Sequence, residues 1–243
     1  MATLYLHPGL RADAAVGARV TVTGEEARHA ITVARVRIGE RIAVGDGAGL
    51  LAWGKVVDAQ PAEFTIEVDE VRWENQPVPA LWLAQALAKG DRDELAVQAA
   101  TELGVAGIIP WAADRSISRW EGPKIAKGRD RWTAIVREAS KQAIRPWVPE
   151  VAELATVQQL AALPGRIVVL EPDAPAALTE LDLSGAVQIV LLVGPEGGIS
   201  PRELATLEDA GASLVHLGRE VLRTSTAGPA ALAVLAARLG RWS

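Results

Sequence analysis

The chain has 243 residues, of which 49% are hydrophobic and 23% charged, and it contains no cysteine. This length fits one large domain or two small ones, and the composition is ordinary for a globular protein. The lack of cysteine excludes disulfide bonds, thiolate metal sites and cysteine nucleophiles. Because His7, His29 and His216 lie far apart in the sequence, no metal-ligand spacing is visible and we expect no metal.

The formal net charge of −5 disfavours nucleic-acid binding when the chain is taken as a whole. Cations nevertheless gather in residues 28–41, which hold four arginines, and in residues 124–145, which hold seven cations. Phosphate affinity depends on such local patches more than on net charge. For either patch alone, a solvent-exposed helix face is an equally good explanation.

Neither a secretory signal nor a membrane span is predicted. The N-terminus lacks a charged segment followed by a long apolar run, and the most apolar stretch, residues 187–193, has the length of a strand. Together with the lack of cysteine, this favours a cytoplasmic protein.

The first part of the chain has the pattern of a small β-barrel. Alternation of apolar and polar residues and glycine-rich turns predict, in chain order, a strand at 19–23, a short helix at 25–36, strands at 41–44 and 50–57 around a turn at 45–49, and a strand at 64–71. Several short strands separated by glycine turns are typical of such barrels.

Residues 74–79 contain two prolines and predict a linker. Strands and helices alternate after it: a strand at 80–87, a helix at 91–103, a strand at 105–111, a helix at 130–143, strands at 166–171 and 187–193, a helix at 200–210, a strand at 213–217 and a helix at 226–239. This alternation predicts an α/β domain with a mainly parallel sheet.

A glycine-rich loop follows the strand at 187–193. Its sequence is Gly194-Pro195-Glu196-Gly197-Gly198. Ser200, Pro201 and Glu203 then supply an N-cap, a first helical position and a capping box. Loops at the carboxyl ends of parallel strands bind ligands in open α/β sheets, and glycines let a ligand approach the backbone. A tight turn carrying a surface glutamate is an equally good interpretation.

Two more polar segments follow predicted strands. Residues 217–227 contain Arg223, the one cation there placed to face a ligand, although a capped helix with a surface arginine is slightly favoured. Residues 88–95 are charged and are equally typical of a solvated helix start. No phosphate-loop motif occurs in these loops. No histidine occurs in them either, so we do not expect a histidine base.

These segments, in this order, resemble the RsmE family of 16S ribosomal RNA uridine-N3 methyltransferases, within the SPOUT (α/β-knot) superfamily. The stretches that carry the resemblance are Leu87-Ala-Lys-Gly-Asp-Arg-Asp-Glu-Leu95 with Thr101-Glu-Leu-Gly104, Arg145 with Val148-Pro-Glu150, Leu192-Val-Gly-Pro-Glu-Gly-Gly198, and Leu217-Gly218 with Val221-Leu-Arg-Thr224. His29-Ala30, Val33-Ala-Arg-Val-Arg37 and Gly39-Glu40 resemble the family's N-terminal barrel, so the likeness covers nearly the whole chain.

The resemblance implies a PUA-like β-barrel at residues 1–73, a linker at 74–79 and a SPOUT methyltransferase domain with a trefoil knot at 80–243. It also implies a homodimer that uses S-adenosylmethionine, without a metal, to methylate 16S rRNA of the small ribosomal subunit. The cofactor pocket would use Leu192, Gly194, Pro195, Glu196, Gly197, Leu217, Gly218, Leu222, Thr224, Ser225 and Thr226.

Catalysis requires the weakly acidic uracil N3 proton to leave and the charge on the uracil oxygens to be stabilised. We expect Arg223 to stabilise this charge, and Glu196 or a neighbouring hydroxyl to orient the base or accept the proton. The cations expected to bind RNA are Arg28, Arg35, Arg37, Arg115, Lys124, Lys127 and Arg145.

The chain departs from the family pattern at three places. Ser225 stands where many relatives have glutamate, Lys141 lies where many have Glu-Gln, and residues 144–147 replace a Gly-Arg-Asn-Arg run. In that last segment, Trp147 is suited either to stack on a base or to pack within the protein. Three alternatives remain open: a SPOUT enzyme for another RNA such as transfer RNA, a non-catalytic ribosome-associated RNA-binding factor, and a nucleotide-using α/β enzyme.

Overall fold

The computed structural model describes residues 4–10 and 14–242, and the chain forms two compact units. Unit 1 combines Met1–Gln76 with Ser140–Val148, and unit 2 combines Pro77–Ala139 with Pro149–Ser243. The sequence places residues 140–148 in the second domain, whereas the structure groups them with the first.

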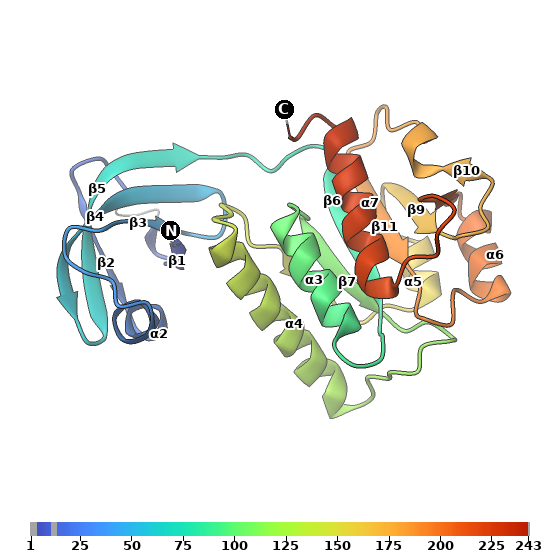
Figure 1. Ribbon diagram of the computed structural model, residues 1–243, viewed down its shortest axis with the longest axis horizontal. Coiled ribbons are helices and arrows are strands. Elements are labelled where there is room, and N and C mark those ends of the chain that lie inside the picture. The colour runs from blue at the N-terminus through green and yellow to red at the C-terminus, as the bar shows by residue number, and fades with distance from the viewer. Residues whose placement is uncertain (1–3, 11–13, 243) are drawn as a thin grey trace. The chain divides into compact units, whose positions relative to one another are not determined.

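Unit 1 is built on a five-stranded sheet in the order β1-β3-β4-β5-β2 (Figure 1). Its elements are β1 (Leu4–Leu6), β2 (Arg19–Thr23), α2 (Glu25–Arg28), the π-helix η1 (His29–Val33), β3 (Arg41–Gly45), β4 (Leu50–Gln60) and β5 (Glu63–Trp73). The predicted strands are confirmed. The sequence missed β1, because its three residues are all buried and show no alternation.

An apolar core fills unit 1. Alternate residues of β2 and β5 point into it, and the Tyr5 and Phe64 rings meet edge to face with their centroids 5.2 Å apart. Burial raises the pKa of the Tyr5 hydroxyl to about 12, and the nearby Glu26 carboxylate adds to this rise.

Backbone and side-chain contacts tie residues 140–148 to unit 1. The Lys141 ammonium lies 3.3 Å from the Glu26 carboxylate, with only 5% and 13% of these side chains exposed. The Trp147 indole donates a hydrogen bond of 2.7 Å to the Glu74 carbonyl, and its ring lies against Gly49. A Cβ at Gly49, whose φ is +110°, would come 2.8 Å from that ring. Trp147 therefore packs within the protein, and Lys141 forms an internal ion pair.

Unit 2 contains a seven-stranded sheet in the order β10-β12-β9-β11-β6-β7-β8, in which every recorded pairing is parallel. The strands are β6 (Ala80–Ala86), β7 (Gly107–Trp111), β8 (Glu150–Val151), β9 (Arg166–Leu170), β10 (Ala176–Ala177), β11 (Gln188–Val193) and β12 (Ser213–His216). The helices are α3 (Arg92–Glu102), α4 (Pro123–Gln142, which ends in unit 1), α5 (Val157–Ala161), the 3-10 helix η2 (Leu178–Glu180), α6 (Pro201–Asp209) and α7 (Thr224–Arg238). The predicted parallel α/β domain is confirmed.

The two faces of β6 meet different partners. Ala84 and Ala86 belong to the apolar core that includes residues of α5 and α6, whereas Leu83 faces α7. Gly228 of α7 permits this contact, because a Cβ there would lie 3.0 Å from the Leu83 side chain. Helices α3 and α7 lie side by side next to β6 (Figure 1). In the described part of the chain, no helix has the length and apolar character to cross a membrane.

Candidate functional site

A pocket of about 380 Å³ lies in unit 2, where three parallel strands end. Its walls come mainly from residues 170–172 at and after the end of β9, from the loop that follows β11, and from residues 216–224 at and after the end of β12. Neighbouring parallel strands end at one edge of a sheet, so loops far apart in the sequence converge there. The structure thus brings together all three segments singled out in the sequence, because Arg92 of residues 88–95 also lines the pocket.

Most residues expected to bind the cofactor line this pocket. Those in its wall are Gly194, Pro195, Glu196, Leu217, Gly218, Leu222 and Thr224. Leu192, Gly197, Ser225 and Thr226 are not among the lining residues. Leu192 is the last but one residue of β11, and its side chain is fully buried in the apolar core.

Glu196 connects residues 88–95, the charged segment after β6, to the pocket. Its carboxylate accepts hydrogen bonds from the Lys89 amide at 3.1 Å and the Arg92 guanidinium at 2.9 Å. Burial by itself would raise the pKa of Glu196. Hydrogen bonds from its own amide, Lys89 and Arg92 outweigh this effect and lower that pKa. The carboxylate is therefore held ionised and anchored between two loops.

The loop after β7 braces the glycine-rich loop from the other side. Arg115 donates a hydrogen bond of 3.1 Å to the Gly197 carbonyl, and a Cβ at Gly197 would come 3.1 Å from the Arg115 Cβ. Gly198 has a φ of +73° and closes a tight turn through its amide, which donates to the Pro195 carbonyl. Arg115, expected to bind RNA, thus has an intramolecular partner.

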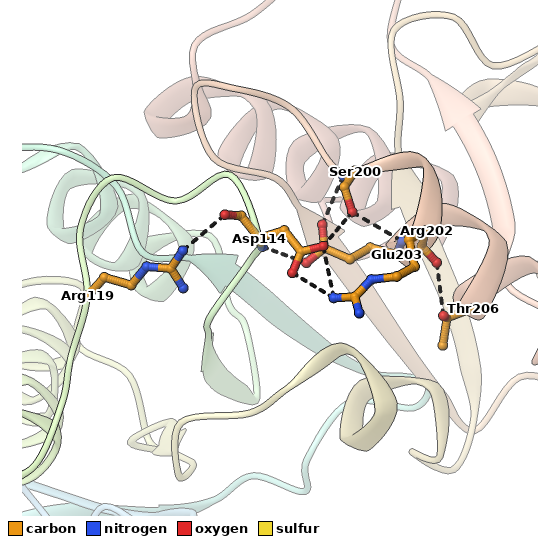
Figure 2. Close-up of polar contacts among 6 residues, drawn as sticks. All are labelled: Asp114, Arg119, Ser200, Arg202, Glu203 and Thr206. Atoms are coloured by element: carbon orange, nitrogen blue, oxygen red, sulfur yellow. Dashed lines mark hydrogen bonds and ion pairs between the residues drawn. The ribbon is translucent and has the colours of Figure 1, made fainter.

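A polar network fixes the start of α6 against the loop after β7 (Figure 2). Glu203 is 1% exposed, and its carboxylate accepts hydrogen bonds from the Asp114 amide at 2.7 Å and the Ser200 amide at 2.9 Å. Ser200 caps the helix in return, because its hydroxyl accepts from the Glu203 amide. The predicted capping box is confirmed, and Glu203 also holds a second loop.

The Asp114 carboxylate completes this network (Figure 2). It accepts a hydrogen bond of 2.8 Å from the Ser200 hydroxyl and pairs with the Arg202 guanidinium at 2.9 Å. The Ser200 hydroxyl and then Arg202 lower the pKa of Asp114. Arg119 donates to the Asp114 backbone carbonyl, so both ends of this residue are tied.

Arg223 and Thr224 stand at the entry of α7. Arg223 is the N-cap residue, is exposed, and lines the pocket. Thr224 is the first residue of the helix, and its hydroxyl donates to the Gly194 carbonyl at 2.8 Å. That hydroxyl also accepts from Gln85 at 2.9 Å. The two loops of the pocket are therefore joined by a side-chain hydrogen bond.

Several lining residues escaped the sequence analysis. His216 is the last residue of β12 and lies in the wall, so a histidine does adjoin the pocket. The segment singled out in the sequence begins at Leu217 and therefore leaves out His216. Leu170 ends β9, and Glu171 and Pro172 follow it. Their position at the end of a predicted parallel strand was the signal that could have identified them.

The cations expected to bind RNA fall in both units. Arg28, Arg35 and Arg37 are exposed in unit 1, where Arg145 is half-buried, and Lys124 and Lys127 are exposed in unit 2. Other cations of residues 124–145 have acidic partners: Arg129 pairs with Glu153, Arg131 with Glu94, and Lys141 with Glu26. The basic patch is thus smaller than the sequence indicates. Within residues 4–10 and 14–242, no cluster of His, Asp and Glu has the arrangement to hold a metal.

Known proteins resemble this chain over most of its length. Family models for an RNA methyltransferase domain and an RNA methyltransferase PUA domain match residues 74–236 and 22–69. The chain is 41% identical to ribosomal RNA small subunit methyltransferase E of Mycobacterium bovis, over 93% of this chain and 89% of that protein. It is 30% identical to the Bacillus subtilis protein of that name, over 88% of each. The crystal structure of the Neisseria gonorrhoeae protein of that name, bound to S-adenosyl methionine, matches with a TM-score of 0.86 and 28% identity, over 98% of each chain.

Proposed function

Because the chain belongs to the ribosomal RNA small subunit methyltransferase E family, we propose that it transfers the methyl group of S-adenosylmethionine to N3 of a uridine in 16S rRNA. The observation that carries this proposal is the pocket at the carboxyl edge of the parallel sheet. Its wall combines the loop at residues 194–199 with Arg223, the one cation of residues 217–227 that lines the pocket.

The pocket suits the proposed cofactor. Its volume of about 380 Å³ lies within the range of small-molecule sites. Apolar side chains such as Val193, Leu217 and Leu222 offer contacts to an adenine ring, and Gly194 and Gly218 leave backbone groups open to it. Carboxylates of Glu171, Glu196 and Glu220 in the wall complement a sulfonium cation. When bound, S-adenosylmethionine supplies an already activated methyl group.

The protein's own task is to position the uracil and stabilise its charge. As the N3 proton leaves to solvent water, negative charge develops on the uracil oxygens. We assign the stabilisation of this charge to Arg223, which lines the pocket. Glu196 is a weaker candidate for the proton acceptor, because Lys89 and Arg92 occupy its carboxylate and its pKa is lowered. We therefore assign Glu196 an orienting role in the cofactor loop.

The RNA contacts, the assembly and the compartment are further parts of the proposal. Arg28, Arg35 and Arg37 of unit 1, with Lys124 and Lys127 of unit 2, are exposed cations suited to phosphate contacts. We propose a homodimer with a trefoil knot in the methyltransferase domain, acting in the cytoplasm on the small ribosomal subunit. Light scattering is expected to give twice the chain mass of 25.6 kDa, and a mass of one chain would contradict the homodimer.

The experiment incubates the protein with methyl-labelled S-adenosylmethionine and three substrates: small ribosomal subunits that lack native methylation, free 16S rRNA, and transfer RNA. Label in the first or second substrate supports the proposal, and the difference between them identifies the preferred state of the RNA. Label only in transfer RNA moves the enzyme to another target. Cofactor binding without any transfer indicates a non-catalytic RNA-binding factor.

A further inference from the structure

Gln85 is fully buried at the carboxyl end of β6, although it carries a polar side chain. A buried amide costs free energy unless its hydrogen-bonding groups are paired. The Gln85 amide nitrogen donates to the Ala86 carbonyl at 3.1 Å and to the Thr224 hydroxyl at 2.9 Å. Among the described residues its oxygen has no hydrogen-bond partner. An apolar residue would avoid this cost, so the core position does not by itself explain the glutamine.

A chain of two hydrogen bonds connects Gln85 to the pocket. Its amide N–H donates to the Thr224 hydroxyl, and this hydroxyl donates its only proton to the Gly194 carbonyl at 2.8 Å. Thr224 and Gly194 both line the pocket, whereas Gln85 lies behind them. The relay therefore joins three segments: the end of β6, the loop after β11 and the start of α7.

A second contact fixes the preceding carbonyl, that of the last residue of β11. The Trp111 indole, fully buried at the end of β7, donates a hydrogen bond of 3.0 Å to the Val193 carbonyl. Val193 is paired in register with Gln85 in the parallel sheet. The carbonyls of Val193 and Gly194 are thus each held by a buried side-chain donor, directly from Trp111 and through Thr224 from Gln85. This leaves the peptide groups at the loop entrance little freedom to rotate.

We propose that Gln85 is a positioning residue for methyl transfer: through Thr224 it fixes the Gly194 carbonyl and so sets the two pocket loops in the arrangement that binds the cofactor. This inference rests on the proposed function, because it takes the pocket to be the S-adenosylmethionine site. It assigns to a buried residue of β6 an effect on cofactor affinity without contact to the cofactor.

The test measures S-adenosylmethionine affinity by calorimetry for Gln85→Leu, Thr224→Val and the double variant. Each single change removes a partner from a buried hydrogen bond, so we expect about a tenfold weaker affinity. The double variant is expected to lose little more than either single one, because all three variants break the same relay. Methylation kinetics are expected to show a raised KM for the cofactor and an unchanged KM for RNA.

Two variants separate positioning from general loss of stability. Thr224→Ser keeps the hydroxyl and is expected to recover most of the affinity that Thr224→Val loses. Thr101→Val removes a buried hydroxyl that donates to Val97 within α3, away from the pocket lining, and is expected to leave cofactor affinity unchanged. Thermal unfolding of all variants compares their stabilities.

The proposal is overturned if Gln85→Leu binds the cofactor like the wild type, or if Thr224→Ser loses as much affinity as Thr224→Val. Equal losses in Thr101→Val and Gln85→Leu contradict it as well. The proposed function fails separately: a wild-type protein that binds S-adenosylmethionine but forms no 3-methyluridine contradicts the assigned target and leaves this affinity test valid.

Discussion

The carboxylate of Glu196 and the guanidinium of Arg92 lie 2.9 Å apart, although 104 positions separate them in the sequence. This ion pair joins the glycine-rich loop after β11 to the start of α3, and the Lys89 amide donates to the same oxygen. A carboxylate held in this way shapes the pocket wall. It is poorly placed to collect a proton, because its hydrogen-bonding partners favour the ionised form.

Replacing Glu196 with glutamine is expected to weaken S-adenosylmethionine binding about tenfold, because a charge-assisted hydrogen bond is worth roughly 1.5–3 kcal/mol. The single-turnover rate at saturating cofactor is expected to stay within about twofold of wild type. Glu208→Gln, at an exposed position of α6, is the control. If Glu196 accepts the proton, the saturated rate instead falls and the acidic limb of the pH profile disappears.

Arg223→Ala is expected to slow methyl transfer on the enzyme by about 100-fold, since removing one group that stabilises a developing anion has an effect of this size. Cofactor affinity is expected to change little. Arg223→Lys is expected to restore part of the rate, because the charge remains and the planar donor geometry is lost. Arg219→Ala, an exposed arginine outside the pocket lining, is the control in single-turnover measurements. Wild-type transfer by Arg223→Ala contradicts the assigned role.

Asp114 predicts a pH dependence of stability. Its pKa is lowered in the folded protein, so its contribution is fully present above the unfolded value of about 3.9 and is lost as the pH falls through the folded value. The difference in unfolding free energy between wild type and Asp114→Asn is therefore expected to be constant from about pH 5 to 7 and to shrink below about pH 4. Asp209→Asn, exposed at the end of α6, is the control in urea unfolding. A difference that widens on acidification contradicts the network in Figure 2.

The exposed arginines of unit 1 predict a salt-dependent contribution to RNA binding. Arg35→Ala and Arg37→Ala are each expected to reduce the slope of log affinity against log salt by about 0.7–0.9, the value for one phosphate contact. Arg19→Ala removes an exposed arginine of β2 and serves as the matched control. Unchanged slopes in both variants exclude these two residues from the RNA interface.

Much of the fold follows from the sequence because local physics determines it. The capping box of Ser200 and Glu203 and the apolar run of β11 predict their elements to within a residue or two. Contacts between distant segments are harder to predict. No periodicity indicates that Trp147 packs against Gly49, or that Lys141 pairs with Glu26, so the sequence does not show that residues 140–148 contact the first unit.

The candidate site shows the same division. The glycine loop and the segment around Arg223 follow strands and could be found from that position. Gln85 sits within an apolar strand and Glu203 within a helix cap, and only the folded chain shows that each reaches another loop. The sequence also does not indicate the hydrogen bond of Arg115 to the Gly197 carbonyl, because these residues lie 82 positions apart.

Nucleoside analysis of methylated RNA tests the central claim most directly. Small ribosomal subunits without native methylation are treated with the protein and S-adenosylmethionine, and their 16S rRNA is digested to nucleosides and separated by mass spectrometry. The account predicts 3-methyluridine with the wild type and far less with Arg223→Ala. A methyl group on another atom or another base, formed by the wild type, would contradict the account.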